Sequence, residues 1–252
     1  QRPVPWTRLI WVTWRQHRVA LAGVAVLLGG VGLYLLIMGL KIHSGYASVA
    51  SCHPAGSAAC QLTNNLFTSD YYPFAQLVSG FLLVVPVLVG VFVGGPVLAR
   101  ELETGTFRFA WTQGTGRTRW VIAKLVLVAA VVTVAAGATS LTLSWWVAPF
   151  FAQGWSLLGP NVFALTGIVY PAWTLIAFAL GAFAGVAIRR TVPAMAAAMV
   201  AWAGLAIATA TYLRWRYQAA ITVKALGHAA ATVPARAWIH VRWSGPNGGP
   251  VN

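Results

Sequence analysis

Long apolar runs alternate with short polar segments along most of the chain. Five runs stand out, at residues 19–40, 74–99, 121–148, 162–188 and 192–213. About twenty apolar residues in a helix span the hydrocarbon core of a bilayer. A lipid-exposed backbone also has to satisfy its own hydrogen bonds, as a helix does. The pattern therefore predicts an all-α fold, a polytopic membrane helical bundle with five visible transmembrane helices.

Composition agrees with a membrane protein. Hydrophobic residues make up 59% of the chain and charged residues only 8%, whereas soluble domains carry about 25% charged residues. The net charge of +14 comes mostly from basic residues that flank the apolar runs. No RNA-binding or DNA-binding motif accompanies it, so nucleic acid is not an expected partner.

Basic residues predict the orientation, because Lys and Arg collect in cytoplasmic loops. They lie before the first run, between the second and third runs, and between the fourth and fifth runs: Arg2, Arg8, Arg15, Arg18, Arg100, Arg108, Arg117, Arg119, Arg189 and Arg190. We therefore expect a multi-pass protein of the cell membrane with a cytoplasmic N-terminus. Segment 214–252 would then be extracytoplasmic although it carries basic residues, since long segments obey the rule weakly.

The apolar runs hold few ionisable groups. None contains Asp, Glu, Arg or His, and the only Lys is Lys124. Ion-coupled transporters place ionisable groups near the membrane midplane, and a metalloprotease motif such as H-E-x-x-H needs His and Glu. The sequence therefore argues against an ion-coupled pump and an intramembrane hydrolase. It indicates no catalytic, metal-binding or cofactor-binding residue.

The two cysteines, Cys52 and Cys60, share the predicted first outer loop, in "SCHPAGSAAC". A pair within one short loop on an oxidising face favours a disulfide. Two alternatives stay open. The thiols could be free, or they could form a metal site with His43 and His53, although this spacing matches none of the usual zinc frameworks.

An aromatic and basic segment, "WTRLIWVTWRQHR", precedes the first run. Trp favours the membrane interface and Arg meets anionic headgroups, so residues 1–18 are predicted to form a cytoplasmic amphipathic helix in contact with membrane lipids. The alternative is a simple flank of the first span that sets its topology. The residues of this helix would be Trp6, Arg8, Trp11, Trp14, Arg15 and Arg18.

Two G-x-x-x-G motifs lie in the second and fourth runs, Gly90 with Gly94 and Gly181 with Gly185. The motif lets two helices approach closely. It could serve dimerisation, but packing within the subunit is the favoured interpretation.

Two of the three acidic residues in the chain, Glu101 and Glu103, lie in the predicted cytoplasmic segment 100–118. They could pair with Arg100, Arg108 or the N-terminal arginines, which at an exposed site would add about 0–1 kcal/mol each. They could instead form part of a charged surface for a cytoplasmic partner.

The stretch "ARELETGTFRFAWTQGTGRTRWVIAKL" resembles the segment between the second and third spans in permeases of type 2 ATP-binding-cassette exporters, particularly actinobacterial ones. The resemblance extends to the N-terminal helix, the cysteine-containing loop and the Arg189-Arg190 turn, and it covers the chain to about residue 215. Family members have six spans and five are visible here, so a sixth could be missing from this sequence. The matching positions are Glu101, Glu103, Gly105, Thr106, Arg117, Arg119, Trp120, Lys124 and Leu125.

The resemblance implies that this segment is a coupling helix that docks into a groove of a cytoplasmic ATPase subunit. Two permeases, identical or different, and two ATPases would form the working unit, with ATP and Mg bound by the partner, since no Walker A motif is present here. The runner-up is a non-transporting membrane anchor or assembly factor. The implied coupling residues are Glu101, Glu103, Thr104, Gly105, Thr106, Arg108, Gln113 and Arg117.

Three regions are thus expected along the chain. Residues 1–18 form the cytoplasmic interfacial helix. Residues 19–213 form the transmembrane domain, which includes the coupling segment 100–118. Residues 214–252 form an extracytoplasmic C-terminal segment. The substrate is not indicated by the sequence.

Overall fold

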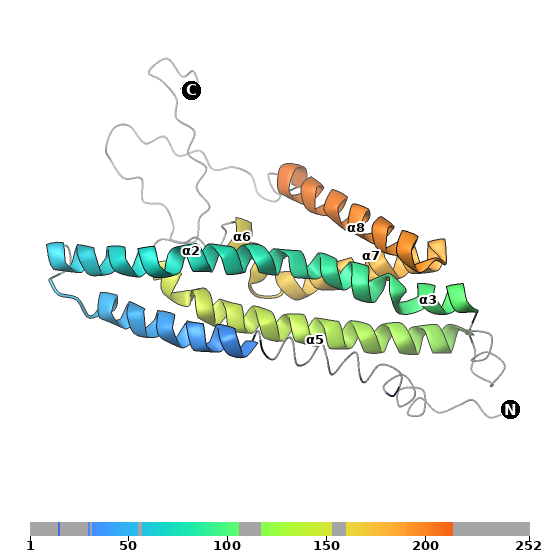
Figure 1. Ribbon diagram of the computed structural model, residues 1–252, viewed down its shortest axis with the longest axis horizontal. Helices are drawn as coiled ribbons and strands as arrows, with labels where there is room; N and C mark the ends of the chain where they lie inside the picture. The colour runs from blue at the N-terminus through green and yellow to red at the C-terminus, as the bar shows by residue number, and fades with distance from the viewer. Residues whose placement is uncertain are drawn as a thin grey trace, which may run out of the picture.

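A computed structural model describes residues 15, 30, 32–54, 57–105, 117–152 and 160–213 of the chain. Every regular element in these residues is a helix (Figure 1). Five helices are long and apolar enough to cross a membrane: Gly32–Ala50, Ala58–Thr104, Thr118–Phe151, Val169–Ile188 and Thr191–Leu213. The predicted all-α, polytopic bundle is confirmed.

The first helix and α2 (Ala58–Val89) form a hairpin at one end of the molecule (Figure 1). The sequence predicted a first span that ends at residue 40 and a loop up to residue 73. The helix instead continues to Ala50. Its extra turns pack on α2, with Ile42 fully buried and Tyr46 against Phe67. Aromatic packing therefore keeps this more polar stretch helical.

A disulfide between Cys52 and Cys60 closes the tip of the hairpin. The predicted bond is confirmed, and it removes the free-thiol and zinc alternatives. Ser57 caps α2, because its hydroxyl oxygen accepts a hydrogen bond from the backbone N–H of Cys60 at 3.2 Å. A serine at this position satisfies one of the unpaired donors of a helix start.

The second spanning helix changes its winding partway along. After α2 it passes through a π-helix, η1 (Gly90–Gly94), into α3 (Pro96–Thr104). Gly95 donates its N–H to the carbonyl of Gly90 at 2.9 Å, five residues back. Pro96 has no N–H to give to the regular ladder. The helix thus carries an irregular joint directly before α3.

The fourth apolar run is divided, which the sequence did not predict. A short helix, α6 (Pro160–Leu165), is followed by a turn and then by α7 (Val169–Ile188). Gly167 has φ +63 in this turn, a conformation that glycine adopts without steric cost. Ser140 of α5 (Arg117–Ala152) lies with its hydroxyl 3.1 Å from the carbonyl oxygen of Leu165 and 2.8 Å from that of Gly167.

Helix α7 packs along the second spanning helix through the two glycine motifs. A Cβ added to Gly90 would lie 2.6 Å from the carbonyl oxygen of Ala177, and one added to Gly185 would lie 2.5 Å from that of Gly95. A Cβ on Gly181 would overlap the carbonyl oxygen of Gly90. The backbones touch within one subunit, which confirms the predicted use of both motifs.

The last spanning helix comprises α8 (Thr191–Ala208) and a π-helical end, η2 (Thr209–Leu213). Arg189 has φ +59 and ends α7. In Figure 1, α2 and α5 lie along the long axis and α8 is inclined to them. The end of α3 and the α7–α8 turn lie together at the end opposite the hairpin (Figure 1).

Four predicted segments lie wholly or partly outside the described residues, and one of them is the first predicted span, of which residues 19–29 and 31 are not described. Of the predicted interfacial helix, the structure describes Arg15, which is helical and exposed. Segment 214–252 lies outside the described part, as do residues 106–116 of the predicted coupling segment. The interfacial residues Trp6, Arg8, Trp11, Trp14 and Arg18 therefore stay predictions.

Candidate functional site at the end of α3

The last residues of helix α3, from Arg100 to Thr104, form the start of the predicted coupling segment 100–118. Its C-cap residue is Gly105, with φ +72 in the left-handed region. Glycine commonly ends a helix in this way, because it has no Cβ to clash there. Thr104 turns its hydroxyl back to the carbonyl of Arg100 at 2.9 Å. The chain leaves α3 here and enters α5 at Arg117.

Glu101 ties α3 to α5. Its Oε1 lies 2.5 Å from Nζ of Lys124, and the Lys124 side chain is 5% exposed against 24% for that of Glu101. A buried ammonium needs a partner, since its solvation by water has been lost. Lys124 Nζ also lies 5.6 Å from the ring centroid of Trp120. Glu101 thus neutralises the lysine of the third span.

Glu103 ties α3 to α8. Its Oε2 accepts two hydrogen bonds from Thr191, one from the backbone N–H at 2.9 Å and one from the hydroxyl at 2.7 Å. The N-cap residue of α8 is Arg190, which makes no side-chain cap. A carboxylate suits a helix N-terminus, because the free N–H groups and the helix dipole are both favourable to negative charge. Glu103 therefore caps α8 from another helix.

The structure gives both glutamates partners that the sequence did not suggest. The sequence offered Arg100, Arg108 or the N-terminal arginines, and of these the structure describes Arg100 and Arg15. In the structure Glu101 pairs with Lys124, and Glu103 binds Thr191. The signal for Lys124 was present, because a lone Lys in an apolar run needs a carboxylate. Nothing in the sequence marked Thr191.

Small side chains bring α3 close to α7 and α8. Ala99, Ala184 and Ala194 form one buried cluster, one residue from each helix. A second cluster joins α3 to α7 through Leu98 and Phe178, with residues of α5 packed against it. The end of α3 therefore lies where α5, α7 and α8 meet.

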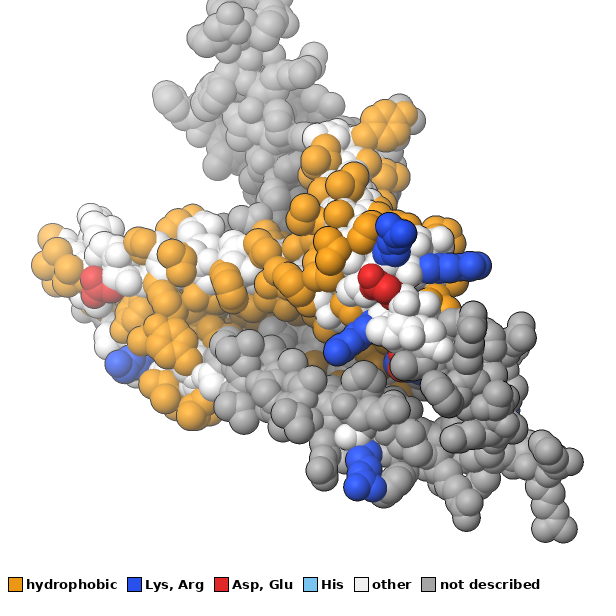
Figure 2. Space-filling view, turned by 45° about the vertical axis from the view of Figure 1, so that its right-hand side comes forward, with side chains coloured by type: hydrophobic (Ala, Val, Ile, Leu, Met, Phe, Trp, Pro, Cys, Tyr) orange, Lys and Arg blue, Asp and Glu red, His pale blue; other side chains and the backbone are white. Residues whose placement is uncertain are grey.

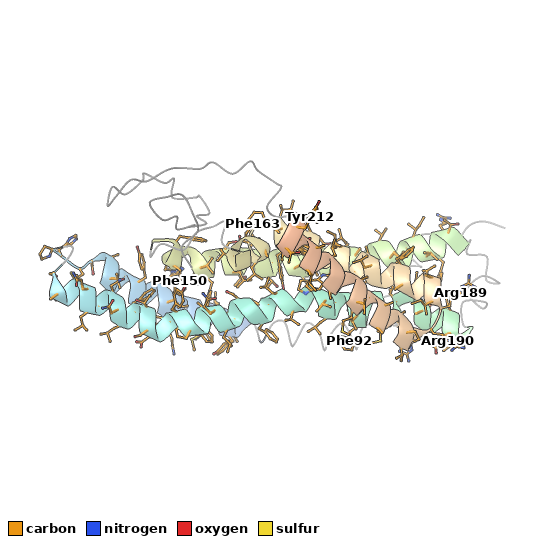
Figure 3. All side chains as sticks on the ribbon, turned by 90° about the horizontal axis from the view of Figure 1, so that it is seen from above. Phe92, Phe150, Phe163, Arg189, Arg190 and Tyr212 are labelled. Carbon is orange, nitrogen blue, oxygen red and sulfur yellow. A yellow bond between two sulfur atoms is a disulfide. The ribbon has the colours of Figure 1, made fainter. Side chains whose placement is uncertain are left out.

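Exposed arginines surround this meeting point. Arg100, Arg189 and Arg190 are all exposed. Figure 2 shows Lys and Arg side chains around an acidic one at this end of the molecule, and Figure 3 places Arg189 and Arg190 at the end of the bundle near α3. Three exposed arginines against one exposed carboxylate, that of Glu103, make the described part of this face predominantly positive.

The structure assembles part of the predicted coupling set. Glu101, Glu103, Thr104 and Gly105 lie at the end of α3, and Arg117 begins α5. Thr106, Arg108 and Gln113 lie outside the described residues. The part of the chain that is described holds no group of three His, Cys, Asp or Glu side chains that could bind a metal ion.

Comparison with known proteins bears on what this arrangement serves. No curated protein and no solved structure matches the chain. A family model described as "ABC-2 membrane transporter related" matches residues 21–214, which is most of the chain and includes all five spanning helices in the described residues. The chain therefore belongs to the ABC-2 membrane transporter related family, as a membrane-spanning permease of an ABC transporter.

Proposed function

We propose that this permease is the membrane subunit of an ATP-driven exporter and that a separate ATPase docks on the segment between α3 and α5. The observation that carries the proposal is that the end of α3 is linked to two other spanning helices. Two carboxylates bind it to α5 and α8, and the docking segment starts directly after it, at Gly105. A displacement of that segment would therefore act on three spanning helices at once.

The proposed orientation puts the N-terminus and the α3 end in the cytoplasm. The exposed residues Arg100, Arg189 and Arg190 support it, because Lys and Arg prefer the cytoplasmic side. The disulfide of Cys52 and Cys60 supports it too, since it lies at the opposite end of the bundle and disulfides persist on an oxidising face. The proposed location is the cell membrane.

The residues at the site suggest a separate role for the ATPase and for the permease. The partner ATPase would bind ATP and Mg and supply the chemical step. In this chain, the docking segment would receive the movement, and α3 would carry it inward as a rigid helix. Glu101 would pass it to α5 through Lys124. Two copies of the permease and two ATPase subunits would form the working unit, with the substrate path between the permeases.

Co-purification with a candidate ATPase tests the docking segment. Arg108→Glu together with Gln113→Glu should weaken the complex. The two introduced negative charges would repel a partner surface that is complementary to the positive Arg108. Arg236→Glu is the matched control, since residue 236 lies in the segment proposed to be on the other side of the membrane. Unchanged recovery of the ATPase with the double variant would contradict docking at this segment.

A second measurement separates an exporter from a non-transporting anchor. Vesicles that contain the complex should show ATP-dependent movement of a substrate, found by a screen for compounds that stimulate ATP hydrolysis. An anchor would keep the ATPase bound but would show neither stimulation nor transport. A complex that binds the ATPase and fails both assays over a broad screen would therefore overturn the export proposal.

A further inference from the structure

We propose that the turn between α7 and α8 is a second relay, besides the pair of Glu101 and Lys124, by which movement of the docking segment reaches the spanning helices. Thr191 is the positioning residue through which α3 moves α8. The inference rests on the proposed function, because it assigns a path to the movement that the ATPase would supply. It also gives Glu103 a role inside the permease rather than at the partner surface.

The contact itself is short and doubled. Oε2 of Glu103 accepts two hydrogen bonds from Thr191, at 2.9 Å from the backbone N–H and 2.7 Å from the hydroxyl. Arg190 is extended, with φ −130 and ψ 132, and offers α8 no cap of its own. If Glu103 moves, the first turn of α8 has to follow or lose its cap.

The helices α3 and α8 pack closely beneath this contact, so a displacement of one can be transmitted to the other. Ala99 of α3 and Ala194 of α8 are both fully buried in one cluster with Ala184. A Cβ on Gly95 would lie 3.2 Å from the side chain of Met195. Small residues at this spacing leave little compressible side chain between the helices, and closely packed interiors transmit strain.

The same region contains a joint at which α3 can tilt. The π-helix η1 precedes α3, and Pro96 donates no backbone hydrogen bond. Irregular turns of this kind often mark functional sites within helices. A tilt at this joint would move Glu101 and Glu103 together, while the start of η1 stays bound to α7 through Gly90 and Gly181.

Helix α8 is suited to respond. In the span Thr191–Leu213, only 11% of the most apolar window is buried inside the molecule, against 39% for Val169–Ile188. Most side chains in this window of α8 are therefore not buried against the other helices. The α7–α8 turn, with Arg189 in the left-handed region, is the covalent pivot between the fixed helix and the exposed one.

A proline substitution isolates the contact. Thr191→Pro removes both donors, yet proline is favoured at the first position of a helix, and the extended backbone of Arg190 is the conformation that precedes proline. Transport per ATP hydrolysed should fall by about fivefold or more, the lower range of coupling between two sites. Thr191→Ser keeps both donors and should behave as the native protein. Thr209→Val is the matched control, since Thr209 bonds the Leu205 carbonyl of its own helix.

A crosslink then separates a positioning role from a merely structural one. The described residues contain no free cysteine, so Glu103→Cys with Thr191→Cys introduces a defined pair. The reduced pair should be uncoupled, and oxidation to a disulfide should restore transport per ATP, with the native chain treated identically to control for Cys52 and Cys60. Normal transport per ATP in Thr191→Pro would overturn the relay. So would failure of the formed crosslink to restore it.

The amount of ATPase that co-purifies with each variant distinguishes the relay from the proposed docking segment. The relay predicts full recovery of the ATPase with Thr191→Pro, because the docking segment is unchanged. If Thr191→Pro recovers the ATPase and transports normally per ATP, the relay is contradicted, whereas the proposal that the ATPase binds the docking segment is not. Loss of the ATPase from Thr191→Pro would contradict the relay as well, since the turn would then act in docking itself.

Discussion

Tyr170 donates its phenolic O–H to the backbone carbonyl of Leu82, 3.2 Å away in the interior. That carbonyl is the one that Pro86 leaves without a donor in α2, because proline has no N–H for the carbonyl four residues earlier. A side chain of α7 thus completes the hydrogen bonding of α2. The contact fixes the depth at which the second and fourth spanning helices pack.

Removal of this hydroxyl should destabilise the bundle. Tyr170→Phe keeps the ring, which is 2% exposed, but leaves the Leu82 carbonyl unsatisfied. We expect a loss of about 0.5–2 kcal/mol, measured as a lower midpoint of thermal unfolding in detergent. Tyr34→Phe is the control, since Tyr34 is 49% exposed. Equal midpoints for Tyr170→Phe and the native protein would contradict this role.

The glycine contact between η1 and α7 gives a sharper test of packing. Gly181→Ala introduces a Cβ that overlaps the Gly90 carbonyl oxygen, which is backbone and cannot rotate away. Overpacking of this kind costs about 1–3 kcal/mol. Gly204→Ala is the matched control, because a Cβ there meets nothing within 4 Å. Thermal unfolding in detergent should separate the two variants, and a native-like Gly181→Ala would show that the backbones are not in contact.

The sequence predicted what depends on local pattern. Apolar length predicted the five spanning helices found in the described residues, and the spacing of Gly90 and Gly94 indicated close packing. The loop with Cys52 and Cys60 indicated the disulfide. Each of these features is set by residues close together in the chain, so no tertiary information was needed.

The sequence could not predict what depends on which helices meet. Glu103 and Thr191 are 88 residues apart, and no periodicity relates them. Similarly, the end of the first helix was placed too early, because the polar residues after residue 40 are held helical by packing on Phe67. The break in the fourth run at Gly167 was not predicted, because the run stays apolar through it. The hydroxyl that bonds the Gly167 carbonyl belongs to Ser140 of α5, which is distant in the chain.

The disulfide provides a test of orientation. In intact cells, a membrane-impermeant thiol reagent should label neither cysteine until a reductant is added, because Cys52 and Cys60 are bonded to each other. Cys52→Ala leaves one free thiol and should be labelled without reductant. Labelling of that variant only after the cells are permeabilised would place the hairpin in the cytoplasm and reverse the proposed orientation.

The pair of Glu101 and Lys124 should respond asymmetrically to the loss of either partner. Lys124 is 5% exposed and its neighbours on α5 are apolar, whereas Glu101 is 24% exposed and can regain some water. Glu101→Leu therefore leaves a buried ammonium unpaired and should lower the free energy of unfolding by about 1–3 kcal/mol. Lys124→Met should cost less, since the Glu101 side chain is the more exposed of the two.

The double variant, Glu101→Leu with Lys124→Met, should recover most of the lost stability, because replacing both members of a buried ion pair by apolar residues is often neutral. Thermal unfolding of the four proteins in one detergent gives the coupling energy directly as a double-mutant cycle. A double variant as unstable as Glu101→Leu would contradict the ion pair. In that case, the cost would arise from packing at the end of α3, and the link between α3 and α5 would rest on the apolar cluster around Leu98 and Phe178.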